Sequence, residues 1–303
     1  MRQDLGTVGY QSAQATHAAI DYCMKWTPHQ WWSLSNRLVI LSVPDESILF
    51  EVYQDALSKG CKATLFCEPA KSYEATSLAL EPCESGMDLS RFKLLSPKVF
   101  PYPANKDRED LVCKMENAHQ NDKQTIMQHG FSIREAAFSL YERIYGFTAT
   151  SQAHWDVILP TAFLEGPFNQ FLRDNLHDAM TIWNYTLFHD CGKPSCLEYD
   201  VEGRRHFPEH EIVSSQVWSH VGSEDEARLM LLDMSLHRMK AEGLSAFLEV
   251  TSPKNVATLL LTSYAEVYAN AIDNSPEGTE SVSFKIKRKH LDRLTKKLVA
   301  RYT

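Results

Sequence analysis

The pattern of hydrophobic and polar positions divides the chain into two parts. In the first hundred residues, apolar runs typical of buried strands alternate with stretches whose apolar residues share one face of a helix. The sequence Pro44-Asp45-Glu46 marks a helix start, and Gly60 suits the C-terminal end of that helix. The predicted strands are residues 37–43, 63–66 and 76–81, and the predicted helices are residues 9–25 and 46–60. This order is typical of a small α/β sandwich, which we place at residues 1–97.

Strand-like runs nearly vanish in the rest of the chain. Prolines at 97, 101 and 103, followed by a charged stretch, predict a stiff connection, so residues 98–125 are interpreted as a linker. Helical periodicity then dominates, for example in residues 133–141 and 257–271. We therefore predict an all-helical second domain at residues 126–303 and an α+β multidomain fold for the chain as a whole.

Composition agrees with a folded protein, since 44% of the residues are hydrophobic and 23% are charged. No apolar run approaches the roughly 20 residues that span a bilayer, and the first residues lack the apolar core of a signal peptide. We therefore expect a cytoplasmic protein without membrane association. The net charge of −8 argues against indiscriminate binding of nucleic acid.

The last segment of the chain departs from this acidic balance, because residues 285–301 carry eight lysines and arginines against one aspartate. Leucines at 291, 294 and 298 would form the buried stripe of a solvated terminal helix. Residues 283–287 alternate between apolar and basic, so Phe284 and Ile286 could also dock on the core while the lysines face outward. The expected phosphate contacts of this segment are Lys285, Lys287 and Lys289.

Histidines concentrate in the second domain, and one of them is followed directly by an aspartate. An apolar helix ends at adjacent His189 and Asp190, and the chain then turns through Gly192. An imidazole and a carboxylate at one helix end can bind the same divalent cation when another helix brings further histidines opposite. The candidates for those histidines are His154, His210 and His237. In this arrangement Lys193 would face a bound phosphate.

The sequence around this pair resembles the HD superfamily of phosphohydrolases. His-Asp-Cys-Gly-Lys-Pro at 189–194 is followed by Gly-Arg-Arg-His-Phe at 203–207 and Glu-His-Glu at 209–211. This order is particularly similar to the HD domain attached to bacterial CCA-adding enzymes, which acts on 2′-phosphate and 2′,3′-cyclic phosphate nucleotides. The resemblance implies a metal-dependent phosphohydrolase whose cofactor is a divalent cation, namely Mn²⁺, Mg²⁺, Ni²⁺, Fe²⁺ or Zn²⁺.

The same resemblance implies roles for individual residues. The implied metal ligands are His154, His189, Asp190, His210 and His237. The final acid of the family falls at Asn270, with Asp273 one turn further on, and an asparagine can still ligate through its carbonyl oxygen. The implied catalytic residues are Asp190 and Lys193, and the residues expected to stabilise phosphate charge are Lys193, Arg204 and Arg205.

Residues 2–82 resemble the archaeal/eukaryotic-type peptidyl-tRNA hydrolases. The resemblance is carried by Arg-Gln-Asp-Leu at 2–5, by Gln-Ala-Thr-His-Ala at 14–18 and by two later stretches in the same order. The residues of its site that remain are His17 and Thr76. The lysine of the family is replaced by Tyr10, and Ala70 stands where relatives carry an aspartate. We therefore expect a binding module for an RNA end or a partner protein.

These observations favour a metal-dependent phosphohydrolase or phosphodiesterase that acts on a nucleotide or on the 3′ end of an RNA such as tRNA. Two alternatives remain open. A peptidyl-tRNA hydrolase would work through His17 and Thr76 without the lysine of its family, and a non-enzymatic adaptor would bind RNA or protein.

Overall fold

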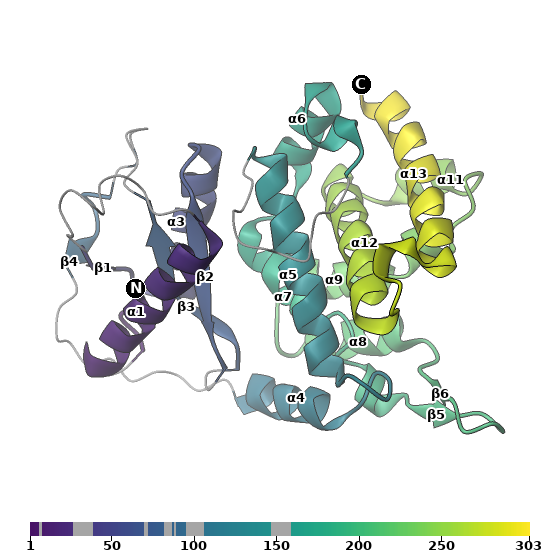
Figure 1. The fold of residues 1–303 in the computed structure, drawn as a ribbon, viewed down its shortest axis with the longest axis horizontal. Helices are drawn as coiled ribbons and strands as arrows, with labels where there is room; N and C mark the ends of the chain where they lie inside the picture. The colour runs from purple at the N-terminus through teal and green to yellow at the C-terminus, as the bar shows by residue number, and fades with distance from the viewer. Residues whose placement is uncertain are drawn as a thin grey trace. The chain divides into compact units, whose positions relative to one another are not determined.

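The computed structural model describes residues 1–5, 8–26, 39–69, 72–81, 87, 89–94, 106–146 and 159–303 (Figure 1). The chain divides into two compact units. Met1–Glu109 makes up most of the first, called here the N-terminal unit, and most of the chain from Asp110 onward makes up the second, called here the helical unit.

The N-terminal unit combines two helices with short antiparallel strand pairs. Its elements are α1 (Val8–Lys25), β1 (Leu41–Ser42), α3 (Glu46–Ser58), β2 (Ala63–Glu68), β3 (Glu74–Leu80) and β4 (Lys93–Leu94). Strand β2 pairs with β3, β1 pairs with β4, and both helices pack on the β2–β3 pair. This confirms a small α/β region at the start of the chain.

Most of the elements predicted here are present. Asp45 caps α3, because its side chain accepts a hydrogen bond from the Ile48 amide at 3.0 Å, and Gly60 follows the helix with φ +79°. The strand predicted at residues 37–43 is shorter, since only Leu41–Ser42 is extended in a sheet among its described residues. Val43, directly after β1, forms an isolated parallel bridge with Arg2.

The helical unit is built around α12, which is buried along most of its length and packs against α5, α6, α9 and α13. Figure 1 shows α12 between α5 and α13. The helices are α4 (Lys106–Asn117), α5 (Ile126–Ile144), α6 (Gly166–Asn175), α7 (Ala179–Phe188), α8 (His210–Trp218), α9 (Glu224–Leu232), α10 (Ser235–Arg238), α11 (Leu244–Val250), α12 (Pro253–Asn274) and α13 (Val282–Tyr302). Short 3₁₀ turns are η2 (Thr161–Phe163), η3 (Lys193–Ser195) and η4 (Gly278–Glu280), and a small hairpin is formed by β5 (Glu198–Tyr199) and β6 (Arg205–His206).

Two expectations for the chain beyond residue 97 differ from the structure. The range 98–125, interpreted as a linker, contains α4. Residues 283–289 are helical, because Ser281 caps α13 and the buried leucine stripe continues the helix to its end. Phe284 is buried as expected, but Ile286 is 66% exposed, so the predicted extended segment with both side chains docked is wrong. Among the residues described, no helix has the length and apolar character needed to cross a membrane.

Candidate metal centre

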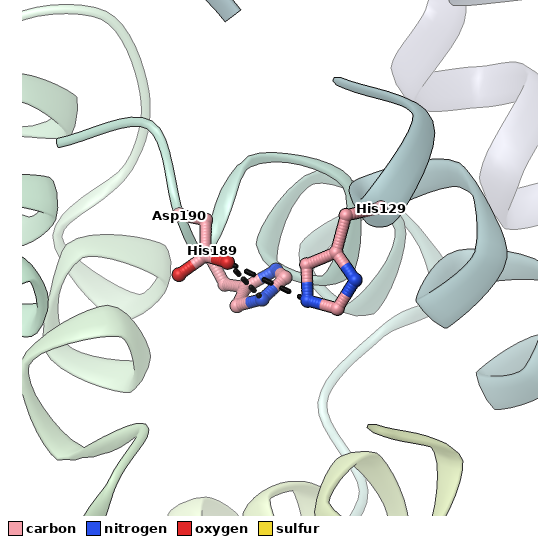
Figure 2. A group of neighbouring side chains, drawn as sticks. All are labelled: His129, His189 and Asp190. Atoms are coloured by element: carbon pink, nitrogen blue, oxygen red, sulfur yellow. Dashed lines mark ion pairs between the residues drawn. The ribbon is translucent and has the colours of Figure 1, made fainter. Parts of the chain in front are cut away.

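Two histidines and an aspartate converge in the interior of the helical unit. His129 lies on α5, whereas His189 and Asp190 lie in the turn that follows α7 (Figure 2). His129 Nε2 lies 3.6 Å from Asp190 Oδ2, and His189 Nε2 lies 3.2 Å from the same oxygen. One ligand atom from each residue lies within 4.8 Å of the other two, and all three side chains are buried. This arrangement is suited to a metal ion.

A close approach of α5 to α7 brings these residues together. A Cβ atom added to Gly130, which follows His129 on α5, would lie 2.2 Å from the carbonyl oxygen of Leu187 on α7. Real Cβ contacts are never this short, so the two helices require glycine here. The glycine therefore sets the distance between His129 and the pair at the end of α7.

A second close contact brings α8 to the same turn. A Cβ atom on Gly192 would lie 2.4 Å from the Ser214 amide nitrogen, and the Gly192 amide donates to Ser214 Oγ at 2.9 Å. This contact places His210, the first residue of α8, with its Nε2 atom 3.5 Å from Asp190 Oδ1. Two of the later sequence candidates, His210 and Lys193, thus lie with the His-Asp pair.

The imidazole orientations are fixed by backbone carbonyls. The Nδ1 atom of His189 donates to Thr186 O at 3.0 Å, and that of His210 donates to Phe207 O at 3.0 Å. Metal-binding histidines commonly donate their second ring N–H in this way, which leaves Nε2 for the cation. Both Nε2 atoms accordingly face Asp190.

Lys193 brings a positive charge to the same carboxylate. Its Nζ atom lies 2.6 Å from Asp190 Oδ2 and 3.0 Å from Gln120 Oε1, and only 6% of the residue is exposed. The ammonium also lies 5.3 Å from the centre of the Phe207 ring. Lys193 is therefore held inside the site and does not extend into solvent.

The pKa values show how strongly the site favours positive charge beside Asp190. Burial alone would raise the pKa of Asp190, but His189 and Lys193 outweigh it and hold that pKa well below its usual value. Burial lowers the pKa of His129 to about 4, although Asp190 opposes this shift. Burial also disfavours the charged form of His189, yet Asp190 raises its pKa to about 9. The carboxylate that favours the charged form of His189 would also attract a divalent cation.

A second polar group, from α7, α9, α10 and α12, lies near this cluster. His237 Nε2 is 2.8 Å from Glu266 Oε2, and the Tyr185 hydroxyl donates a hydrogen bond to Asp233. Burial raises the pKa of Glu266, but His237 outweighs burial and lowers it overall. The Glu266 carboxylate also favours the charged forms of His129 and His189, although less strongly than Asp190 does.

The remaining predicted ligands occupy other positions. The amide of Asn270 donates to Glu266 Oε1 at 3.4 Å, and Asp273 Oδ2 accepts from Gln124 at 2.9 Å. The acid of α12 that contacts a histidine is therefore Glu266, and neither predicted residue belongs to the cluster. His154 lies outside the described residues.

The predicted phosphate-binding residues are dispersed. Arg204 is mostly exposed and pairs with Asp200 at 2.8 Å, and Arg205 pairs with Asp122 at 2.7 Å, on or beside the β5–β6 hairpin. Lys287 is exposed on α13, and its positive charge, like burial, opposes the rise in the pKa of His237 that Glu266 causes. The other predicted tail contacts, Lys285 and Lys289, are exposed on α13.

The sequence arguments miss His129 and Glu266. Spacing from the His-Asp pair selects the upstream histidine at 154, whereas the useful signal is the glycine directly after His129 in a helical pattern. Glu266 lies about one helical turn before Asn270, the position that the family pattern favours.

The N-terminal unit contains a polar network around Thr76. The buried Thr76 hydroxyl donates to Gln14 Oε1 at 2.8 Å, and the Gln14 amide donates to Glu68. Burial and the neighbouring Glu68 carboxylate raise the pKa of Tyr10 to about 12. His17 is exposed, with its ring centre 4.8 Å from that of Phe66. Gln14 therefore links Thr76 to an acid, Glu68, which the sequence arguments miss.

One family model matches the N-terminal region of the chain. Residues 1–88 match the family model described as peptidyl-tRNA hydrolase PTH2. This confirms the resemblance stated for the N-terminal region, and it does not extend to the helical unit. No curated protein and no solved structure matches the chain.

Proposed function

We propose that the helical unit is an HD-type metal-dependent phosphohydrolase or phosphodiesterase. The observation that carries this proposal is the convergence of His129, His189 and Asp190, buried and with ligand atoms within 4.8 Å of one another. Two imidazoles and a carboxylate this close together form a donor set that suits a divalent cation. The adjacent histidine and aspartate, followed by glycine and lysine, give the sequence counterpart of this geometry.

The donor set fits a divalent transition metal. Two imidazoles suit Fe²⁺, Ni²⁺ and Zn²⁺, while the carboxylate also suits Mn²⁺ and Mg²⁺. The carbonyl hydrogen bonds to the Nδ1 atoms of His189 and His210 leave their Nε2 atoms available on the side of Asp190. A cation bound here would supply Lewis acidity toward a phosphoryl oxygen and lower the pKa of a coordinated water.

The protein side chains would orient and stabilise the substrate. Lys193 places a buried ammonium next to Asp190, where it would stabilise the negative charge of a phosphoryl group. Gln120 accepts a hydrogen bond from the same ammonium at 3.0 Å and keeps it in place. His210, on the other oxygen of Asp190, would add a third imidazole to the donor set around the cation.

We propose a nucleotide or the 3′ end of an RNA, such as a 2′,3′-cyclic or 2′-phosphate terminus of tRNA, as the substrate. The match of residues 1–88 to a peptidyl-tRNA hydrolase family supports a tRNA-related partner. Tyr10 replaces the lysine of that family, and the Thr76 hydroxyl is engaged in a buried internal hydrogen bond. The N-terminal unit would then serve mainly to recognise the RNA.

The direct test is turnover by the full-length protein. The metal-free protein is supplied with Mn²⁺, Ni²⁺ or Mg²⁺ and with 2′,3′-cyclic, 2′- and 3′-phosphate substrates, and release of products is measured. We expect metal-dependent cleavage that Asp190→Ala abolishes. Absence of turnover with every metal and substrate would refute the proposal.

A second candidate is peptidyl-tRNA hydrolysis by the N-terminal unit, favoured by the family match and by the Glu68–Gln14–Thr76 network. The assay is cleavage of an N-blocked aminoacyl-tRNA in the presence of EDTA. Activity that is lost in Thr76→Val but retained in Asp190→Ala would establish this function. If the aminoacyl-tRNA is not cleaved while the phosphate substrates are, the N-terminal unit is a binding module and not a hydrolase.

A further inference from the structure

Helix α13 carries a row of basic side chains along its exposed face. Lys289, Arg293 and Lys296 follow one another at spacings of four and three residues, and all three are exposed. With a rise of 1.5 Å per residue, the row is about 10 Å long. We call these three residues the α13 row.

The α13 row has no counterion within the described part of the chain, whereas neighbouring cations on the helix do. Arg288 pairs with Asp292 at 2.9 Å, and Lys285 pairs with Glu280 at 2.8 Å. Like charges three or four residues apart destabilise a helix. A polyanion that neutralises the row would remove this repulsion, so the helix favours such a ligand.

The opposite face of α13 decides which kind of polyanion fits. Its leucines at 291, 294 and 298 are fully buried in the core of the helical unit. A helix that lies on a lipid surface inserts its apolar face among the headgroups, and in α13 that face is already occupied. The α13 row is therefore presented by a rigid, anchored helix to a hydrated partner.

We propose that the α13 row binds the phosphate backbone of an RNA. The choice of RNA rests on the proposed function, in which a tRNA end is the substrate, while the binding surface itself rests on the geometry of α13. Contacts of this kind position a nucleic acid without reading its sequence. Lys287, two residues from Lys285 and from Lys289, faces another side of the helix and is not part of the surface.

The experiment measures binding of a fluorescently labelled tRNA transcript to the full-length, metal-free protein in EDTA, by anisotropy, between 50 and 200 mM KCl. The variant is Lys289→Gln/Arg293→Gln/Lys296→Gln. Three phosphate contacts correspond to a slope of about 2.7 in log affinity against log salt, or about a 40-fold loss of affinity over this range. We expect the variant to lose roughly this part of the salt dependence.

The matched control removes the same number of positive charges, three, from exposed positions on α4, on the loop after it and on α9. It is the triple variant Lys114→Gln/Lys123→Gln/Arg228→Gln. We expect its slope to remain within about one unit of the wild-type slope. Equal loss in both triple variants, or an unchanged slope in the α13 variant, overturns the inference.

A third arm measures partition of the same proteins onto vesicles rich in phosphatidylserine. We expect weak partition that does not depend on the α13 row. Tighter binding to vesicles than to tRNA, lost in the α13 variant, would assign the row to a lipid surface and overturn the choice of RNA. Because binding is measured in EDTA, a failure of metal-dependent turnover refutes the proposed function and leaves this measurement unchanged.

Discussion

Replacing Asp190 with asparagine tests the charge balance of the candidate metal centre. The carboxylate has Lys193 Nζ at 2.6 Å, His189 Nε2 at 3.2 Å and His210 Nε2 at 3.5 Å. The amide has nearly the same shape but no charge, so the buried Lys193 ammonium loses its counterion. Removing one partner of a buried ion pair typically destabilises a protein by about 3–5 kcal/mol, and we expect the lower end because the amide oxygen still accepts a hydrogen bond.

The assay is thermal unfolding in EDTA, which isolates the ion pair from any contribution of bound metal. A loss of about 3 kcal/mol corresponds to a fall in Tm of about 6–12 °C for a unit of this size. Lys193→Met alone should lower Tm less, because the His189 imidazole still lies beside the carboxylate. Metal content and turnover are measured separately, and both should be lost in Asp190→Asn.

The double variant Asp190→Asn/Lys193→Met completes the cycle. If the orphaned ammonium causes the instability, removing it should restore most of the lost Tm while turnover stays absent. A double variant as unstable as the single Asp190→Asn variant would refute this reasoning. The cycle thus separates the structural contribution of the pair from its contribution to metal binding.

The other expected outcomes concern the first ligand, a close helix contact and the N-terminal unit. His129→Asn should remove bound metal, as measured by elemental analysis, whereas His154→Asn should retain it, and the reverse result would restore His154 as the first ligand. Gly192→Ala places a Cβ atom 2.4 Å from a backbone nitrogen of α8 and should lower the free energy of unfolding by about 2–3 kcal/mol, measured with urea. An unchanged unfolding midpoint would contradict the tight packing. Thr76→Val removes the donor to Gln14 and should destabilise the N-terminal unit by about 1–2 kcal/mol in the same assay. A variant as stable as the wild type would show that this hydrogen bond contributes nothing to stability.

Local sequence signals are enough for much of the fold. The cap at Asp45 and the glycine at position 60 bound α3 to within two residues, because capping depends on neighbours in the sequence. The alternating segment predicted at 283–287 fails for a related reason. Alternation over five residues is outweighed by the Ser281 cap and by the leucine stripe that continues for the rest of α13.

The candidate site could be predicted from the sequence only where its residues are close together in the chain. His189, Asp190 and Lys193 lie together because one turn after α7 contains all three. The spacing argument that selects His154 has no such constraint, because any helix of the unit could supply a histidine from a distance. Sequence separation alone therefore does not distinguish His129 from the other histidines of the second domain.

The contact between α5 and α7 suggests a more informative criterion than spacing. A ligand on a neighbouring helix can reach the end of α7 only if the two backbones approach closely, and close approach requires a residue without a side chain. Gly130 meets this condition next to His129, because a methyl group at this position would lie only 2.2 Å from the Leu187 oxygen. Gly192, in the turn after Asp190, allows a similarly close approach of α8, the helix that begins at His210. In a helical metal site, a ligand that is distant in the sequence is therefore better sought among histidines that lie next to a glycine in a buried helix than among histidines chosen by spacing alone.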